Sequence, residues 1–278
     1  MAKAPDAAMP SYRAQIIVLR KTRLGETDLI ITGFSGEGRQ VRAVAKGARK
    51  PGSKLGVHLE LYSITHVLLH KGRNLDIITE ASGVVSNRDC RADVLHSAGA
   101  AVIVEMLDRV SADGDGEARL FPLASEALRC VGTVPDEGVA LITAAAVLKM
   151  SAQLGFRPSL TQCVYCGDDV VAVLKGDADA AIETVPGDTL GFSFEQGGVI
   201  CDTCLSELTE NSYRHRDAQL IRWAEVLITS KFVDLECYGD EEHAGLGRAL
   251  LDFAREWLRF HLVNRLKSLD FLLSFTRG

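Results

Sequence analysis

The stretch YRAQIIVLRKTRLGETDLIITGFSGEGRQVRAVAKG, residues 12–47, predicts three short β-strands separated by glycine turns. β-Branched residues and alternating polar residues fill each segment, which is the pattern of half-buried strands. The glycines of SGEG, residues 35–38, can adopt positive φ and therefore favour a tight turn between the second and third strands. Two further strand-like segments follow, LYSITHVLLH at residues 61–70 and LDIITEA at residues 75–81.

The number and spacing of these segments predict the fold of the N-terminal part. Five short strands in about 70 residues, with one longer connection between the third and the fourth, favour a Greek-key β-barrel of the OB type. An SH3-like barrel is the nearest alternative. We assign the barrel to residues 1–81.

The hydrophobic pattern changes after residue 81. Segments rich in Ala and Leu at residues 95–111, 118–132 and 137–155 predict successive helices. A further helix within residues 240–266 is predicted by an apolar stripe with spacings of three and four. The stripe consists of Leu246, Leu250, Phe253, Trp257 and Phe260. The expected fold class is therefore α+β, an OB-fold β-barrel followed by an all-α domain over residues 82–278.

Four of the seven cysteines form two CxxC pairs, Cys163/Cys166 and Cys201/Cys204. Four thiolates close a tetrahedral shell around zinc and leave no open coordination position, which predicts a structural zinc element at about residues 160–206. The sequence GFSFEQGGVI before the second pair predicts a strand, a turn and a strand that bring the pairs together. The alternatives are four reduced cysteines without metal, or a redox pair of the CxxC type. The dispersed Cys90, Cys130 and Cys237 are expected to be buried small hydrophobic residues.

The charge of the chain is unevenly distributed. The formal net charge is −6, yet residues 1–80 contain 13 Lys and Arg against 7 Asp and Glu, a net charge of +6. The other 198 residues contain 18 against 30, a net charge of −12. A locally basic surface attracts polyanions, although an ordinary solvated face is the plain alternative.

The basic residues fall where an OB barrel binds oligonucleotides, on the second and third strands and on the loops 1–2 and 4–5. Arg42 and Lys46 share one face of the third strand, with Val41 and Ala43 on the other. Aromatic residues for base stacking are sparse in this region, so we expect contacts mainly to phosphates. The candidate DNA-binding residues are Arg20, Lys21, Arg23, Arg39, Arg42, Lys46, Arg49, Lys50, Lys54, Lys71 and Arg73.

Several other function classes find no support in the sequence. It contains no GxxxxGK[ST], GxSxG or HExxH motif, so we expect no enzymatic activity. It contains neither an apolar run of about 18 residues nor an N-terminal apolar signal core, which predicts a cytoplasmic protein without a membrane partner.

Taken together, the motifs resemble those of the bacterial RecO family of recombination mediators. The resemblance rests on LGETDLIITGFS, VRAVAKGARKPGSKLG, GRNLDIITEA, the paired CxxC with FSFEQGGVIC, and LKSLDFL near the C-terminus. It implies an OB fold, a helical domain and a zinc element on the four paired cysteines. It also implies binding of single- and double-stranded DNA, annealing of complementary strands, and a nucleoid-associated location.

The same resemblance implies protein partners. Members of the family act with RecR to load RecA onto strands coated by single-strand binding protein, whose acidic C-terminal tail docks on the helical domain. Two other classes stay open from the residues alone. An RNA-binding OB protein would have a similar barrel and zinc element. A zinc enzyme would need an open position on the metal.

Overall fold

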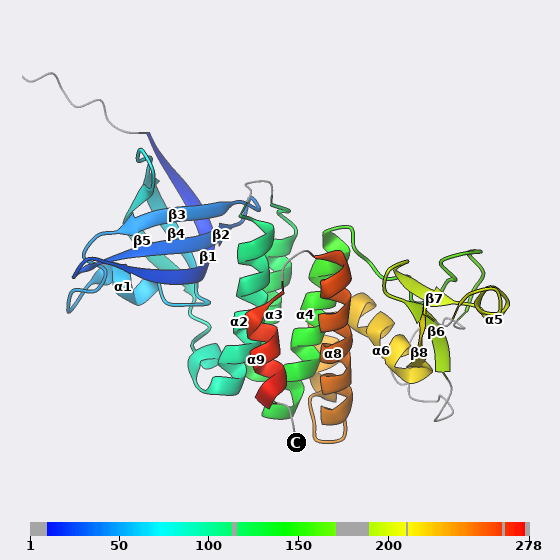
Figure 1. Cartoon of the computed structure of the whole chain (residues 1–278). Helices are drawn as coiled ribbons and strands as arrows, with labels where there is room; N and C mark the ends of the chain where they lie inside the picture. The colour runs from blue at the N-terminus through cyan, green and yellow to red at the C-terminus, as the bar shows by residue number, and fades with distance from the viewer. Residues whose placement is uncertain (1–9, 113–115, 171–188, 210, 263–264, 276–278) are drawn as a thin grey trace, which may run out of the picture.

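The computed structural model describes residues 10–112, 116–170, 189–209, 211–262 and 265–275. It places a β-barrel, a bundle of helices and a small sheet element in a row (Figure 1). No helix in these ranges is both long enough and apolar enough to cross a membrane.

The N-terminal unit is a closed barrel with the strand order β1-β2-β3-β5-β4. All neighbouring strands are antiparallel except β3 and β5, which pair in parallel. This is the arrangement of an OB fold, and the predicted fold class is confirmed. Its elements are β1 (Ser11–Leu24), β2 (Asp28–Ser35), β3 (Gln40–Ala45), α1 (Lys54–His58), β4 (Ile64–His70) and β5 (Asp76–Val85).

The two faces of the barrel strands have different surroundings. Alternate residues such as Ile16, Val18 and Ile31 point inward and form the core of the barrel. On the outer face, Ile17 and Phe34 join the core of the helical domain instead. One side of the barrel is therefore covered by helices.

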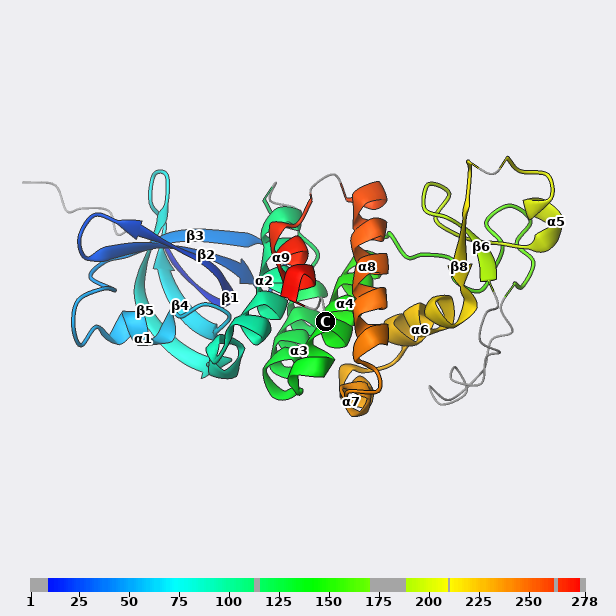
Figure 2. The same ribbon diagram turned by 60° about the horizontal axis from the view of Figure 1, so that its bottom comes forward.

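The helical domain surrounds one fully enclosed helix, α4 (Val139–Gln153). Residues 139–151 are all buried, and α4 lies in the middle of the bundle in both views (Figures 1 and 2). A helix that is apolar all round has to be enclosed on every side. The other helices are α2 (Val94–Val110), α3 (Leu120–Thr133), α6 (Ala218–Thr229), α7 (Phe232–Leu235), α8 (Ala244–His261) and α9 (Lys267–Phe275).

The predicted helices correspond to α2, α3, α4 and α8. The stripe on α8 packs into the core as expected at Leu250, Phe253 and Trp257. Phe260 differs, because 56% of its surface is exposed, and its ring stacks on the Phe194 ring with the centroids 5.6 Å apart. The division at residue 81 stays a prediction, and β5 continues to Val85.

The charged Lys149 lies within the enclosed helix and is only 8% exposed. Its ammonium group donates hydrogen bonds to the carbonyl oxygens of Ile228, at 2.9 Å, and Ser230, at the end of α6. A lysine at the C-terminus of a helix satisfies carbonyl groups that have no partner within the helix. Burial lowers the pKa of Lys149 to about 8, and the positive charge of Arg157 contributes.

We predict that Lys149→Met changes how the free energy of unfolding depends on pH. The folded state releases the Lys149 proton near pH 8, below the ordinary pKa of 10.5, so burial of this charge destabilises the fold below pH 8 and not above pH 10.5. Wild type should therefore gain stability relative to the variant as the pH rises through this window. Urea denaturation across this pH range measures the difference, with the exposed Lys231→Met as the control. Parallel pH curves for wild type and Lys149→Met would contradict the prediction.

Candidate nucleic-acid interface and metal centre

The basic loop, which we define as residues 46–56, begins after β3 and includes the first residues of α1. Its base is fixed by Asp28, because Oδ1 of Asp28 accepts the Gly47 N–H at 2.8 Å. Gly47 has φ of +65°, a conformation that favours glycine. At its other end, Ser53 caps α1 by accepting the Gly56 N–H at 3.3 Å. The loop is thus held at both ends.

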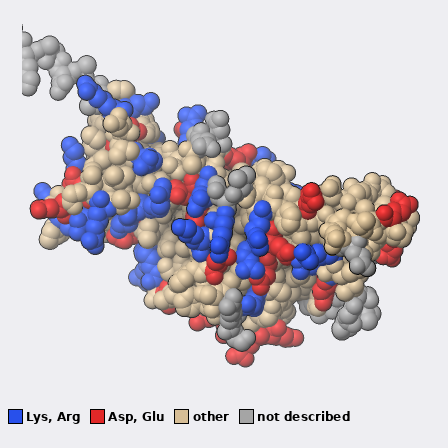
Figure 3. All heavy atoms as spheres, viewed as in Figure 1, with Lys and Arg blue, Asp and Glu red and all other residues tan. Residues whose placement is uncertain are grey.

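The basic loop and the end of β1 enclose an open hollow of about 570 Å³. The hollow is lined by four of the predicted DNA-binding residues, Lys21, Arg23, Arg49 and Lys50. Lys and Arg gather on the surface of the barrel near α1 (Figure 3). The structure therefore concentrates positive charge here, as a polyanion site requires.

The four basic residues that line the hollow differ in whether their side chains are bound by other parts of the protein. The Arg49 guanidinium donates to the carbonyl oxygens of Glu26, at 2.8 Å, and Gly25, so it ties the basic loop to the β1–β2 turn. Lys21 forms an ion pair with Glu60 at 2.7 Å. Within the described ranges, Arg23 and Lys50 have no ion-pair partner. Among the four basic residues that line the hollow, these two are therefore exposed cations without an ion pair.

The strand β3 presents one more of the predicted residues. Arg42 is exposed while Val41 and Ala43 are buried, so the predicted alternation is confirmed within the strand. Lys46 is also exposed, but β3 ends at Ala45, so this residue lies in the basic loop and not on the strand as predicted. Lys54, the first residue of α1, is also exposed.

Arg20 lies apart from the hollow, at the junction with the helical domain. Its Nε atom lies 3.0 Å from Oδ2 of Asp108 on α2, and Gln40 donates to Oδ1 of the same carboxylate at 3.0 Å. Asp108 thus holds both β1 and β3 against α2. The sequence gives no signal for this contact, since Arg20 and Asp108 are 88 residues apart.

The remaining predicted residues lie on two turns. Arg39 is exposed in the β2–β3 turn. Lys71 and Arg73 are exposed in the β4–β5 loop, at the end of the barrel opposite α1 in both views (Figures 1 and 2). The Lys71 ammonium lies 6.0 Å from the centre of the Tyr12 ring. The eleven candidates therefore do not form one patch, and their contacts with DNA stay a prediction.

The metal centre is built from the two CxxC pairs. The sulfur atoms of Cys163, Cys166, Cys201 and Cys204 all lie within 4.8 Å of one another, and the Sγ atoms of Cys166 and Cys201 are 3.6 Å apart. Tetrahedral zinc with bonds of about 2.3 Å separates its sulfur ligands by roughly 3.8 Å. These four residues are therefore placed to bind one metal ion, and thiolates suit zinc.

A small sheet brings the pairs together. It has the order β7-β6-β8, with strands β6 (Thr189–Ser193), β7 (Gly198–Ile200) and β8 (Arg214–Asp217). The β6–β7 hairpin confirms the predicted strand, turn and strand. The first CxxC pair is joined to it because the Val164 N–H donates to the Val199 carbonyl at 3.0 Å. Residues 171–188, which the predicted element includes, lie outside the described residues.

The thiols of the cluster differ from one another in pKa. Burial alone would raise the pKa of Cys163, but backbone N–H groups of Cys166, Cys201 and Tyr165 lower it to about 6. The backbone N–H of Asp168 lowers the pKa of Cys166, but burial and the neighbouring thiols outweigh this effect and raise that pKa to about 11. Thiolate is the form that binds metal. Outside the cluster, burial raises the pKa of Cys90 to about 11.

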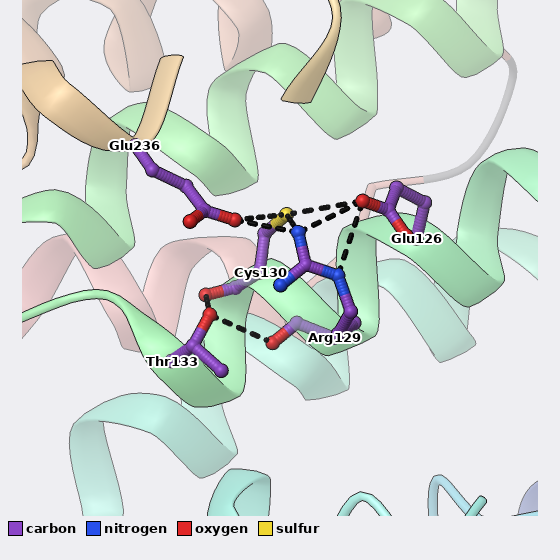
Figure 4. A network of polar contacts seen from close by, with 5 residues as sticks. All are labelled: Glu126, Arg129, Cys130, Thr133 and Glu236. Atoms are coloured by element: carbon purple, nitrogen blue, oxygen red, sulfur yellow. Dashed lines mark hydrogen bonds and ion pairs between the residues drawn. The ribbon is translucent and has the colours of Figure 1, made fainter. Parts of the chain in front are cut away.

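Cys130 belongs to a separate network in the helical domain (Figure 4). Arg129 bridges the carboxylates of Glu126, at 2.8 Å, and Glu236, at 2.6 Å, and thereby joins α3 to the turn after α7. Burial is the largest cause that raises the pKa of Cys130, and the hydrogen bond to Glu236 raises it further. This thiol therefore stays protonated. Cys90 and Cys130 are buried as predicted, but Cys237 is exposed, so that prediction was wrong for Cys237.

Replacing Asp28 tests the anchor of the basic loop. Asp28→Ala removes the acceptor of the Gly47 N–H, so hydrogen exchange at Gly47 and tryptic cleavage after Lys46 and Arg49 should accelerate. Glu26→Ala, in the same turn, keeps the backbone carbonyl that Arg49 uses and should behave like wild type. Equal protection in both variants would show that Asp28 does not hold the loop.

Comparison with known proteins gives the relationships of the chain. The family model Recombination protein O N terminal matches residues 9–87, and the model Recombination protein O C terminal matches residues 91–182. A protein of Rubrobacter xylanophilus named DNA repair protein RecO is 32% identical over 255 residues, which cover 92% of this chain and 92% of that protein.

Two other proteins with the same name extend the comparison. The protein of Frankia casuarinae is 30% identical, with 95% of this chain and 99% of that protein covered. The protein of Desulfitobacterium hafniense is 33% identical over 72% of this chain. The chain spans 66%, just under two thirds, of that protein's length.

Proposed function

Because the chain belongs to the RecO family of DNA repair proteins, we propose that it is a recombination mediator that binds DNA through the basic hollow of its barrel. The observation that carries this proposal is the gathering of Lys21, Arg23, Arg49 and Lys50 around one open hollow. It binds single- and double-stranded DNA and acts without catalysis, in the cytoplasm and at the nucleoid.

Phosphate-led binding also accounts for annealing of complementary strands. Cations that neutralise the phosphates of two strands reduce the repulsion between them and leave the base edges free to pair. The flexible Lys50 and Arg23 side chains suit this task because they make no fixed contact that specifies a base. The expected binding is insensitive to sequence and weakens steeply with salt.

Replacing free cations of the basic loop tests this interface. In Lys50→Ala/Lys54→Ala, the loss of two phosphate contacts should weaken DNA binding and reduce the slope of log K against log salt by about 1.4 on single strands to 1.8 on duplex. Arg49 is left in place because it holds the loop. Fluorescence anisotropy across a salt series measures both quantities. Annealing of complementary strands, bare or coated with single-strand binding protein, should slow in parallel.

The control is Arg214→Ala/Lys231→Ala, which removes two exposed cations outside the barrel. This variant has the same net charge as Lys50→Ala/Lys54→Ala and should bind DNA with nearly wild-type affinity. Equal losses in both double variants would indicate a general charge effect and contradict the loop assignment. Tighter binding of RNA than of DNA of the same sequence would contradict the DNA proposal itself.

The ion that we assign to the four paired cysteines is a structural zinc. Four sulfur ligands leave no position for a reacting water, so the ion would stabilise the sheet element and carry out no hydrolysis. The donor set supports this assignment, because all four ligand atoms are sulfur and converge within 4.8 Å.

Zinc content and stability follow from this assignment. Wild type should hold one zinc per chain at the cysteine cluster, and Cys166→Ser should release it and lower the melting temperature. Cys166 is suited to the test because it is exposed, so the substitution leaves no cavity. Cys237→Ser, which changes the exposed thiol outside the cluster, should keep the metal. A colorimetric zinc assay measures the metal content of the two variants. A Cys166→Ser protein with full zinc content would contradict the assignment of zinc to the four paired cysteines.

The protein partners belong to the same proposal. The chain acts with RecR, and indirectly with RecA, on DNA coated by single-strand binding protein. A hollow of about 320 Å³ between α8 and α9 of this chain suits the acidic tail of single-strand binding protein, because arginines and apolar side chains line it together. Its lining is Arg255, Leu258, Arg259, Arg265, Leu266, Leu269 and Asp270.

A further inference from the structure

A second cluster of metal-binding side chains lies at the start of α2, separate from the paired cysteines. Asp93, His96 and Asp136 each place a ligand atom within 4.8 Å of the other two. Asp93 caps α2, since its Oδ1 atom accepts the His96 N–H at 2.9 Å, and Asp136 lies in the connection between α3 and α4. The carboxylates are exposed, whereas His96 is 9% exposed.

The ring of His96 is oriented by its other nitrogen. Nε2 lies 3.0 Å from the carbonyl oxygen of Val134, and a carbonyl oxygen only accepts, so Nε2 carries a proton. A histidine that binds a metal almost always donates its second ring N–H in this way. The arrangement directs Nδ1 at the two carboxylates.

The Nδ1 atom is the part of the His96 ring that faces the two carboxylates. It lies 2.7 Å from Oδ2 of Asp93 and 3.7 Å from Oδ1 of Asp136. It is inaccessible to solvent, and among the described residues none forms a correctly aligned hydrogen bond with it. A bare nitrogen lone pair facing two carboxylate oxygens is repulsive, so a positive charge is needed at Nδ1, which either a second ring proton or a bound metal ion supplies.

We propose that Asp93, His96 and Asp136 form a binding site for a divalent transition-metal ion. Such an ion binds the Nδ1 lone pair and one oxygen of each carboxylate, and it takes the place of the Nδ1 proton, which is released to solvent. One imidazole and two carboxylates suit Mn²⁺ and similar ions, in contrast to the thiolates of the cysteine cluster, which select zinc. The exposed carboxylates let the ion enter without unfolding.

The site joins two segments that the helical domain otherwise connects through its core. Asp93 and His96 begin α2, and Asp136 precedes α4. A bound ion therefore fixes the start of α2, directly after the barrel, to the connection that leads into the enclosed helix. It should stabilise the folded chain in proportion to its occupancy.

Mn²⁺ titration of the zinc-loaded full chain tests the site. Electron paramagnetic resonance of free Mn²⁺ should show one bound ion per wild-type chain, and Mn²⁺ should raise the melting temperature. Asp136→Asn removes an exposed ligand and should raise the dissociation constant roughly tenfold or more. Glu137→Gln removes the neighbouring carboxylate, which is outside the cluster, and should bind like wild type. Equal losses in both variants, or no binding to wild type at millimolar Mn²⁺, would overturn the proposal.

A second measurement on wild type does not depend on a variant. Mn²⁺ broadens the nuclear magnetic resonance signals of nearby groups, and the chain has seven histidines that can be labelled. Substoichiometric Mn²⁺ should broaden the ring signals of His96 before those of the other six. Uniform broadening of all seven, or selective broadening elsewhere, would place the ion outside this cluster.

Discussion

The enclosure of α4 is the constraint on which the arrangement of the chain depends. A helix that is buried over residues 139–151 has to be covered on all sides, and α2, α3, α6 and α8 supply the cover. Glycines allow the closest approaches, because a Cβ at Gly99 would lie 2.8 Å from Val139, and one at Gly247 would lie 3.0 Å from Leu141. The barrel then attaches beside α2, and the cysteine element lies beyond α8 (Figures 1 and 2).

Attachment of the barrel determines which part of it faces solvent. The Phe34 ring on the outer face of β2 lies 6.5 Å from that of Phe121 on α3, and Asp108 binds Arg20 and Gln40 at the edge. This side of the strands is therefore closed to a large ligand. The basic loop extends from the free end of the barrel, where its cations stay accessible. Packing of the two units thus displaces the candidate interface from the strands toward the loop.

The sequence predicted what depends on local pattern. Alternation in β3 placed Arg42 outside, and the paired cysteines indicated a candidate metal centre, because each signal lies within a few residues. The roles of Arg20 and Arg49 depend on partners distant in the sequence, Asp108 on α2 and the β1–β2 turn. No periodicity reports such contacts, so three of the eleven basic candidates, Arg20, Lys21 and Arg49, proved to be held by the protein itself.

The cysteine element depends on a neighbouring helix at the far end of the chain. Its sheet has three short strands, which bury too little apolar surface to be stable alone. Phe192 contributes its ring to the helical domain instead, 5.3 Å from Phe253 and 6.5 Å from Trp257 on α8. The aromatic contacts fix one side of the sheet, and the convergent sulfurs fix the other. The described part of the element therefore relies on its packing against α8, and the four converging sulfurs are placed so that a metal ion would add a cross-link between its two CxxC turns.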